Sequence, residues 1–414
     1  MTAAGFAYRH LFARDLPPPA PPWRGFPKYN FIGGHNDPLR IPSTAMAEAA
    51  SAVLQRDGTR LALYNFDGPQ GYRPLREFVV AKAAQRPAIT CSVDDVLITS
   101  GSGQGIDLVN QLLLEPGDTV ILEEFTYGGA LTKLRRLGVN IIGAPLDEDG
   151  LDIDALARVL EDLGSKGVTP KYIYTIPTIQ NPTGSILPLE RRQRLLALTR
   201  QHRVPVFEDE CYADLTWDGS GPPSLYSLDP QQVIHIGSFS KTLAPSLRLG
   251  YMVAGPDVMS QLVACKREMD SGTGALDQMV VAEYFSQSFG EHVGGLSETL
   301  HEKLDTMVDA VEREFGTAVE KMWYPKGGIF LWLKLPDRVD VTKLVVPAAS
   351  AGIAFNPGPE WSCNPAVTKS HLRLCFALPS KDVIREGVAA FARVCFEETG
   401  LPERSANIRR SAQN

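Results

Sequence analysis

One lysine stands among hydroxyl side chains where an apolar stretch of the chain ends. Lys241 lies in the sequence HIGSFSKTLAPSLRLGYMVAG, residues 235–255, and Arg248 follows it by seven residues. A lysine that acts as an amine nucleophile must be held still and must lose its charge, which burial and neighbouring cations promote. The guanidinium of Arg248 offers a planar, permanent charge suited to phosphate. The pattern indicates amine chemistry beside an anion site, although two solvated loop cations would give the same pattern.

A glycine-rich turn follows the strand that we expect over residues 96–100 (VLITS). The turn, GSGQG at residues 101–105, leads into an apolar-periodic helix expected over 105–114. Its three glycines would let backbone amides turn towards an anion at the start of the helix. The turn matches neither the P-loop nor the dinucleotide fingerprint. A phosphate cradle and a plain tight turn therefore stay equally open.

Two further residues follow expected strands and so belong to the edge of a sheet. Tyr127 follows the strand over 119–122, and Asn181 stands in the turn NPTG after the strand over 171–177. Ligands gather beyond the carboxyl ends of strands in parallel sheets. The ring of Tyr127 could stack on a flat ligand, and the carboxamide of Asn181 could hydrogen-bond a ligand oxygen. Taken alone, a half-buried loop tyrosine and a bare turn explain the two residues as well.

Three consecutive acids, Glu208, Asp209 and Glu210, end the strand that we expect over residues 204–208. A carboxylate cluster first suggests a metal site. However, side chains alternate along a strand, so Asp209 points away from both glutamates, and no histidine stands nearby. We therefore predict no metal site and regard Asp209, with Tyr212 three residues later, as the informative pair.

The elements that must hold these residues alternate along the chain between strand and helix. Helical periodicity is clear over residues 105–114 and 190–202. Because the strands are apolar throughout, both faces of their sheet must be covered, which is typical of mostly parallel sheets. We expect an α/β fold whose large domain has a mostly parallel seven-stranded sheet between helices. The expected strands are 96–100, 119–122, 140–145, 171–177, 204–208, 233–237 and 250–254.

The length of 414 residues predicts a large domain and a smaller one. After about residue 285 the expected strands (327–336, 353–358 and 372–379) become shorter and are separated by Pro/Gly turns, which predicts a smaller α+β domain. The proline-rich stretch 16–22 predicts an extended arm. We expect an N-terminal arm and a segment joining the small domain over 1–45, a large cofactor-binding domain over 46–288, and the small domain over 289–414.

Composition narrows the class of protein. The net charge of −7 argues weakly against non-specific nucleic-acid binding. No apolar run approaches the ~20 residues of a membrane span, and the N-terminal sequence has arginines and an aspartate where a signal peptide needs an apolar core. The six cysteines form no CxxC pair and no metal-ligand spacing, so we expect reduced thiols. These features predict a cytoplasmic protein that has neither a membrane nor a nucleic acid as its partner.

Taken together and in this order, the motifs resemble those of the pyridoxal-phosphate-dependent aminotransferases of fold type I, class I/II. The nearest branch contains the 2-aminoadipate and kynurenine aminotransferases. The lysine motif is the most specific, and its combination with NPTG and D-x-x-Y makes coincidence improbable. The matching segments cover roughly residues 30–380 and are SGSGQG (100–105), Tyr127, NPTG (181–184), DECY (209–212), SFSKTLAPSLRLG (238–250), PKGGIFLW (325–332), FNPG (355–358) and HLRLCF (371–376).

The resemblance implies a role for each residue that would touch the cofactor, pyridoxal 5′-phosphate. Lys241 would bind its aldehyde covalently and would move the α-proton of the substrate. Asp209 would pair with the ring nitrogen, and Tyr127 would stack on the ring face. Asn181 and Tyr212 would hydrogen-bond the phenolic oxygen of the ring. The other cofactor-binding residues, mostly around the phosphate, would be Ser102, Gly103, Gln104, Ser238, Ser240 and Arg248.

The resemblance also implies a site for the substrate. Arg373 would bind the α-carboxylate as a bidentate pair, and Gly34 and Asn181 would line the same pocket. The segment that closes over the substrate often reads GGLP-x-P in the family, whereas His35 and Asp37 give it a polar sequence here. This departure leaves the identity of the substrate open, and His35 facing solvent is an equal alternative.

A homodimer with shared active sites follows from the same resemblance. In the family, a tyrosine of the partner subunit reaches the phosphate, often from five residues before a G-Y-x-P-L turn. In this sequence the residue five positions before the turn is Phe66. Tyr64 matches the family tyrosine if this chain has a two-residue insertion between that tyrosine and the turn. We expect Tyr64 to make the contact.

The resemblance implies an aminotransferase that exchanges an amino group between an L-α-amino acid and a 2-oxo acid of the 2-oxoglutarate or pyruvate type, within amino-acid metabolism. A lyase, cyclase or oxidase with the same cofactor would share nearly all the motifs, because the bond that breaks depends on its orientation to the ring. An aminotransferase-like transcription regulator is a remote alternative. Fewer than 35 residues precede the first motif, too few for a winged helix.

Overall fold

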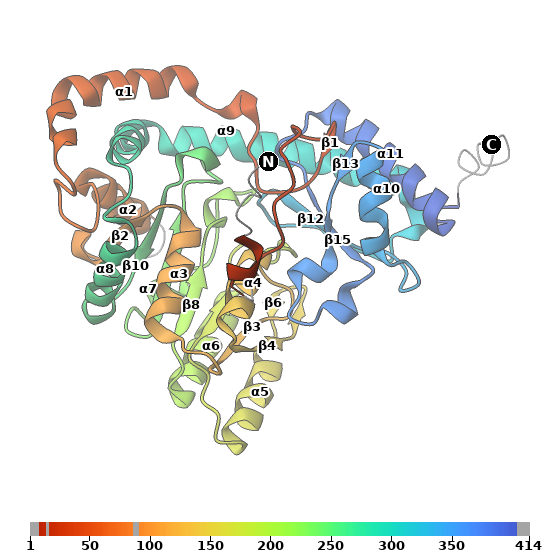
Figure 1. Cartoon of the computed structure of the whole chain (residues 1–414), viewed down its shortest axis with the longest axis horizontal. Coiled ribbons are helices and arrows are strands. Elements are labelled where there is room, and N and C mark those ends of the chain that lie inside the picture. Colours follow the sequence, from red (N-terminus) through yellow and green to blue (C-terminus); the bar gives the residue numbers. More distant parts are fainter. Residues whose placement is uncertain (1–7, 14–15, 86–90, 404–414) are drawn as a thin grey trace, which may run out of the picture.

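A seven-stranded sheet forms the centre of the computed structural model, which describes residues 8–13, 16–85 and 91–403. The strand order is β2-β10-β9-β8-β7-β3-β4, and only β10 runs antiparallel to its neighbours (Figure 1). The expected α/β fold with a mostly parallel seven-stranded sheet is confirmed. The strands are β2 (Val96–Thr99), β3 (Thr119–Glu123), β4 (Asn140–Ala144), β7 (Ile173–Thr175), β8 (Val206–Asp209), β9 (Val233–Ser238) and β10 (Gly250–Val253).

Helices cover both faces of this sheet because its strands are apolar on both sides. Val96 and Ile98 of β2 pack into one buried cluster, whereas Leu97 between them packs into another. The second cluster contains residues of α3, α4 and α8, and the first contains residues of α1, α2, α5, α6 and α7. These helices are α1 (Ser43–Asp57), α2 (Arg73–Gln85), α3 (Ser102–Leu113), α4 (Gly128–Leu137), α5 (Ile153–Ser165), α6 (Leu189–His202), α7 (Leu225–Leu228) and α8 (Pro256–Asp270).

A single long helix, α9 (Ala275–Phe315), joins the two halves of the molecule (Figure 1). Its first turns belong to the buried cluster of the large sheet, through residues such as Met279 and Phe285. Its later turns belong to the core of the C-terminal half, through residues such as Leu300 and Leu304. The boundary expected between residues 288 and 289 therefore lies inside a continuous helix, and the expected division into domains stays a prediction.

The C-terminal half is built on a four-stranded antiparallel sheet in the order β11-β12-β15-β14. The strand β1 (Tyr29–Asn30) pairs in parallel with β13 (Ile353–Ala354), so the N-terminal segment lies with this half. A separate hairpin pairs β5 (Leu146–Asp147) with β6 (Gly150–Leu151). The remaining elements are β11 (Lys321–Trp323), β12 (Phe330–Lys334), β14 (Asn356–Pro357), β15 (His371–Cys375), α10 (Val345–Ser350) and α11 (Lys381–Thr399).

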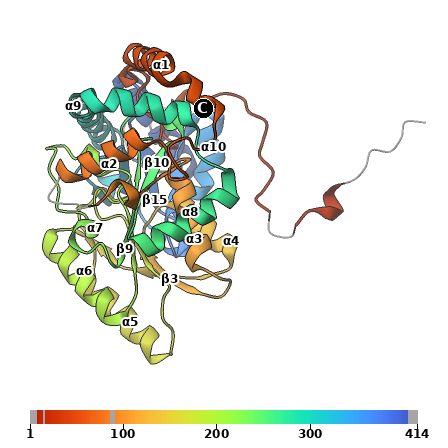
Figure 2. The same cartoon turned by 90° about the vertical axis from the view of Figure 1, so that its left-hand side faces the viewer.

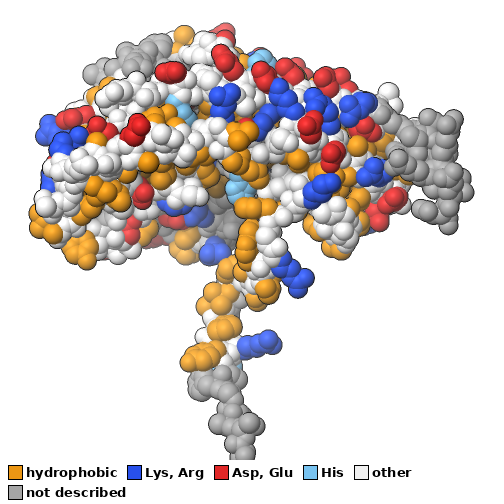
Figure 3. Space-filling model, turned by 90° about the horizontal axis from the view of Figure 1, so that it is seen from above, with side chains coloured by type: hydrophobic (Ala, Val, Ile, Leu, Met, Phe, Trp, Pro, Cys, Tyr) orange, Lys and Arg blue, Asp and Glu red, His pale blue; other side chains and the backbone are white. Residues whose placement is uncertain are grey.

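The N-terminal arm extends away from the body of the molecule (Figure 2). Residues 16–27 form neither helix nor strand, as the proline-rich sequence predicts, and apolar side chains line the arm (Figure 3). Trp23, for example, is 75% exposed. Within the described residues, no helix is both long enough and apolar enough to cross a membrane.

Candidate functional site

A cavity of about 790 Å³ lies where loops of the large sheet meet the C-terminal half. Its lining combines residues that are far apart in the sequence but end up on the same side of the large sheet. Five of the predicted site residues line it: Gly34, Tyr127, Tyr212, Lys241 and Arg373. The cavity is therefore the candidate site.

Lys241 reaches this cavity from the turn after β9, and its amine is bound to the N-terminal segment. The Nζ atom donates a hydrogen bond of 2.9 Å to the carbonyl oxygen of Gly34. A Cβ atom on Gly34 would lie 2.2 Å from this Nζ, so any larger residue there would displace the amine. Burial lowers the pKa of Lys241, and the charges of Arg373 and Arg248 lower it further. The lysine therefore meets both requirements of an amine nucleophile.

Arg373, on β15, is fixed by side-chain and backbone oxygens. Its Nη1 donates to Asn181 Oδ1 at 3.0 Å, and its Nη2 donates to Asn356 Oδ1 at 2.8 Å. Nη2 also donates to the carbonyl oxygen of Gly33 at 3.2 Å. Burial lowers the pKa of Arg373 to about 10, which keeps the guanidinium charged at neutral pH. A fixed and buried cation of this kind suits a carboxylate that enters the cavity.

Two aromatic rings enclose the same guanidinium. The Cζ atom of Arg373 lies 3.6 Å from the ring centre of Phe330 and 3.4 Å from that of Trp361. Such stacking fixes the plane of the guanidinium and holds its charge away from water. Phe330 lies within the motif PKGGIFLW, but no role was predicted for either ring, because only the fold brings β12 and the turn at Trp361 together.

Asn181 connects Arg373 with the tyrosine at the other side of the cavity. Its Oδ1 accepts from Arg373, while its Nδ2 donates to Tyr212 Oη at 3.4 Å. Burial raises the pKa of Tyr212 well above its usual value, so its hydroxyl stays protonated. Tyr127 lies on the same cavity, and burial also raises the pKa of its hydroxyl. These side chains present neutral hydrogen-bonding groups beside the lysine.

Asp209 and its two acidic neighbours point to opposite sides of the sheet, as strand alternation predicts. Asp209 accepts a hydrogen bond of 2.6 Å from Tyr174 Oη and one of 3.1 Å from the backbone N–H of Cys211. Glu208 pairs with His235 at 2.9 Å, and Glu210 pairs with Arg192 at 3.3 Å. Tyr174 was not predicted to have a role, because Tyr172 and Thr175 are also polar-tipped and nothing in the sequence distinguishes Tyr174 from them. Among the described residues, no three or more His, Cys, Asp or Glu side chains form a metal-binding group.

The start of α3 forms a place suited to an anion. A Cβ atom on Gly101, whose φ is +82°, would lie 2.5 Å from Arg248 Nη2, so the guanidinium stands directly beside this turn. At Gly103 no atom lies within 4 Å of a Cβ position, which leaves open space at the first turn of the helix. Backbone amides at a helix start and an arginine together bind phosphate well. Ser238 lies buried at the end of β9, where its Oγ accepts from the N–H of Ser240 at 3.1 Å.

The structure does not bring every predicted residue to the cavity. Gln104 uses its side chain to join α3 to α8, because Oε1 accepts from Lys266 Nζ at 3.0 Å and Nε2 donates to Asp270 at 2.7 Å. The side chain of Gln104 is thus engaged between the two helices, and its expected contact with the cofactor stays a prediction. Tyr64 is 91% exposed and lies outside the cavity of its own chain. Phe66 packs against Tyr72 instead, with ring centres 6.0 Å apart.

The polar residues of the closing segment have structural partners. Asp37 forms a buried ion pair of 2.8 Å with Lys303 of α9. The ring of His35 packs edge-on against Phe26 at 5.2 Å between centres. Burial lowers the pKa of His35, and the charge of Lys241 lowers it further. His35 is therefore held at the edge of the site rather than facing open solvent.

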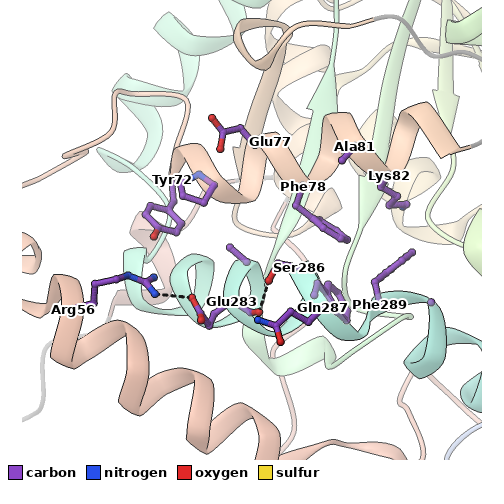
Figure 4. A pocket seen from close by; sticks show the side chains of 14 residues that line it. Arg56, Tyr72, Glu77, Phe78, Ala81, Lys82, Glu283, Ser286, Gln287 and Phe289 are labelled. Carbon is purple, nitrogen blue, oxygen red and sulfur yellow. Dashed lines mark hydrogen bonds and ion pairs between the residues drawn. The ribbon is translucent and has the colours of Figure 1, made fainter.

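A second cavity of about 630 Å³ lies between α2 and α9 (Figure 4). Its walls include Phe78 and Phe289, whose ring centres are 5.2 Å apart, and Arg56 pairs with Glu283 at its rim at 3.0 Å. None of the predicted site residues lines this cavity. The cavity at Lys241 therefore remains the candidate for chemistry.

A family model, a related sequence and two solved structures that resemble this chain are all aminotransferases. The family described as aminotransferase class I and II matches residues 34–391. The 2-aminoadipate transaminase of Thermus thermophilus is 36% identical over 88% of this chain and 89% of its own length. The solved structure of the α-aminoadipate aminotransferase of Thermus thermophilus, complexed with N-(5′-phosphopyridoxyl)-L-leucine, is 35% identical with a TM-score of 0.81, and covers 89% of this chain and 92% of its own. The kynurenine aminotransferase of Pyrococcus horikoshii, in complex with PMP, is 31% identical with a TM-score of 0.83, and covers 90% of this chain and 91% of its own.

Proposed function

The chain belongs to the class I and II aminotransferases, and from this premise we propose which of its residues transfer the amino group and between which substrates. It is a pyridoxal-phosphate-dependent aminotransferase, which moves an amino group between an amino acid and a 2-oxo acid. The proposed donor is an L-α-amino acid, and the proposed acceptor is of the 2-oxoglutarate or pyruvate type. The proposed setting is amino-acid metabolism.

The residues present fit the cofactor. The open space at Gly103 and the guanidinium of Arg248 suit its phosphate, and the amine of Lys241, which is hydrogen-bonded to Gly34, suits its aldehyde. The carboxylate of Asp209 suits its ring nitrogen. We propose that these groups hold the cofactor together with Ser102, Tyr127, Asn181, Tyr212, Ser238 and Ser240.

The observation that carries this proposal is that Lys241 and Arg373 face one cavity. When bound, pyridoxal phosphate supplies an aldehyde for covalent attachment and a ring that takes up electrons from the substrate Cα. Because the pKa of Lys241 is lowered, more of its amine is neutral and able to accept a proton. Lys241 Nζ is thus the proposed base that takes the α-proton from the substrate.

Arg373 is the proposed binding group for the substrate α-carboxylate. Its Nε is buried and has no hydrogen-bond partner among the described residues, so one donor of this guanidinium is left unsatisfied. The stacked rings of Phe330 and Trp361 keep the guanidinium plane fixed while the substrate binds. Asn181 bonds both Arg373 and Tyr212, so it would orient the carboxylate site relative to the cofactor site.

A homodimer and a cytoplasmic location complete the proposal. The exposed Tyr64 supports a shared active site, because a ring that is 91% exposed is free to reach a second subunit. All six cysteines lie within the described residues and are free thiols, which fits a reducing compartment.

The lysine assignment is tested by Lys241→Ala. We expect the variant to lose the visible absorption band of the bound cofactor and at least ~10³-fold of its rate, because no other group could take both roles of the amine. The matched control is Lys266→Ala, which removes another buried lysine at a distance from the cavity and should keep the band. Retention of the band in Lys241→Ala would refute the assignment.

Half-reactions distinguish transamination from the other reactions of the same cofactor. Each amino acid is added singly to the loaded enzyme without an oxo acid. We expect the true donor to yield one equivalent of its 2-oxo acid and then to stop, because the amino group stays on the enzyme. Continued release of ammonia or carbon dioxide would instead identify a lyase or a decarboxylating enzyme.

A further inference from the structure

One segment of the chain touches both functional cations of the site. Residues 33–37 (GGHND) supply the carbonyl oxygen of Gly34 to Lys241 Nζ at 2.9 Å and that of Gly33 to Arg373 Nη2 at 3.2 Å. Asn36 lies in the same segment and contacts neither of these two side chains' charged groups. Its contacts nevertheless lead directly to the lysine.

Asn36 binds the backbone of the turn that carries Lys241. Its Nδ2 lies 3.1 Å from the carbonyl oxygen of Ser240, 3.3 Å from that of Lys241 and 2.8 Å from that of Leu243. The side chain is buried, and its Oδ1 has no partner among the described residues. An unpaired buried acceptor such as this Oδ1 is unfavourable. The hydrogen bonds that Nδ2 donates to the turn therefore explain why an asparagine is buried at this position.

The same turn is also held from α9. His292 Nε2 donates to the carbonyl oxygen of Thr242 at 2.7 Å. Four consecutive carbonyl oxygens, those of residues 240–243, therefore accept hydrogen bonds from side chains of distant segments. This arrangement fixes the backbone from which the long, rotatable side chain of Lys241 extends.

Asn36 is itself anchored by the residue that follows it. Asp37 pairs with Lys303 at 2.8 Å, and Lys303 Nζ also donates to the carbonyl oxygen of Ala377 at 2.6 Å. Asp37 and Lys303 are both buried. The backbone next to Asn36 is thus held by contacts to α9, and through Lys303 to the C-terminal half.

We propose that Asn36 is a positioning residue for amino-group transfer, because it fixes the backbone of Lys241 so that the amine meets the substrate at the correct place. The inference rests on Lys241 as the reactive amine. Displacing a reacting group by ~1 Å can cost ~10²-fold in rate. Asn36 acts through Lys241 and needs no contact with the substrate.

The first test measures hydrogen exchange on the protein without cofactor. In Asn36→Ala we expect the amides of residues 239–249 to exchange at least ~5-fold faster, because the turn loses its anchor. These amides include those of Phe239 and Leu243, which are hydrogen-bonded within this stretch. The control Asn110→Ala removes another buried asparagine, whose Oδ1 accepts from Tyr172 Oη, and should leave this segment unchanged.

The second test uses the loaded enzyme and a single donor. Asn36→Ala should lower kcat of the half-reaction about 10-fold with KM within about twofold, because binding is kept and alignment is lost. The pH at which the visible band of the bound cofactor changes should also move. Asn110→Ala should change neither quantity. Asn36→Ser supplies the same two readouts if the alanine variant does not fold.

Unchanged exchange in residues 239–249, or a raised KM with kcat retained, would overturn the proposal. These outcomes differ from a failure of the proposed function. If Lys241→Ala stayed active, Lys241 would not be the reactive amine and the proposed function would be contradicted. The hydrogen-exchange measurement would still report whether Asn36 holds the turn.

Discussion

At the residue scale, the two arginines of the site differ in their surroundings. Arg373 is buried between two rings and bonded to asparagines, so it can bind only a group that enters the cavity. Arg248 is exposed beside the first turn of α3, where the helix presents unpaired amides. The first suits the substrate and the second suits the cofactor phosphate.

Replacing Arg373 should therefore act on the substrate. We predict that Arg373→Ala raises KM for the amino donor roughly 10- to 100-fold, since a charge-assisted hydrogen bond contributes about 1.5–3 kcal/mol. The dissociation constant of the cofactor should change by less than about threefold. Steady-state kinetics and cofactor titration give the two numbers.

Arg248→Ala is the matched comparison and should show the reverse pattern. Its dissociation constant for the cofactor should rise by about 10-fold or more, because the phosphate loses its cation. With saturating cofactor, KM for the donor should stay close to that of the unaltered protein. If both variants affected the same quantity, the division between substrate and phosphate sites would be wrong.

At the element scale, one buried acid joins β3, β7 and the turn that carries Asn181. Glu123 accepts from Thr175 Oγ1 at 2.6 Å and from Gln180 Nε2 at 2.9 Å. Gln180 in turn accepts from the N–H of Thr183 at 2.9 Å, which shapes the NPTG turn. Burial raises the pKa of Glu123 to about 7, although these hydrogen bonds oppose the shift. The position of Asn181 thus depends on an acid that is costly to ionise.

This acid predicts a pH dependence of stability. From its ordinary pKa of 4.5 up to about 7, folded Glu123 keeps a proton that the unfolded chain has released, so stability falls as pH rises through this window. The fall amounts to at most ~3 kcal/mol. In Glu123→Gln this part of the pH dependence should vanish. Denaturant unfolding at several pH values between 4.5 and 8 measures it.

The control for this prediction is Glu190→Gln at the exposed start of α6, which should keep the slope of the unaltered protein. Glu210, whose pKa burial also raises to about 7, should leave a residual slope in Glu123→Gln. A slope that Glu123→Gln left wholly unchanged would mean that Glu123 is ionised throughout.

At the scale of the whole molecule, the segment between α1 and α2 exposes apolar side chains that no described residue of the chain covers. Tyr64 is 91% exposed and its neighbour Leu63 is 64% exposed. An aromatic ring exposed to this degree is expected at an interface rather than in water. This exposure fits a site that two subunits share.

Mixing two impaired variants at a cofactor concentration too low to saturate Tyr64→Ala tests the shared site. Equal amounts of Lys241→Ala and Tyr64→Ala, unfolded and refolded together, should regain about one quarter of normal activity, because half the dimers are mixed and each has one intact site. Tyr64→Ala alone should bind the cofactor more weakly. Leu63→Ala should stay active by itself. A monomeric mass in light scattering, or no regained activity, would contradict the shared site.

Local patterns in the sequence were enough for the fold and for most of the candidate residues. Each strand of the large sheet is a short apolar run, and apolar residues on both faces require helices on both sides. Asp209 ends a strand, and Lys241 and Asn181 each follow one, and residues in these positions meet at one edge of a parallel sheet. Their types and order, together with the resemblance to the aminotransferases, therefore predicted the chemistry before any contact was known.

Contacts between distant segments could be found only in the tertiary structure. Lys241 meets Gly34 across 207 positions, and Arg373 meets Asn181 across 192. The same holds for the rings around Arg373, for Asn36 beneath the lysine turn, and for Gln104, whose side chain turns to α8. The physical reason is that local pattern specifies the face of an element on which a side chain lies, whereas packing decides which other element covers that face.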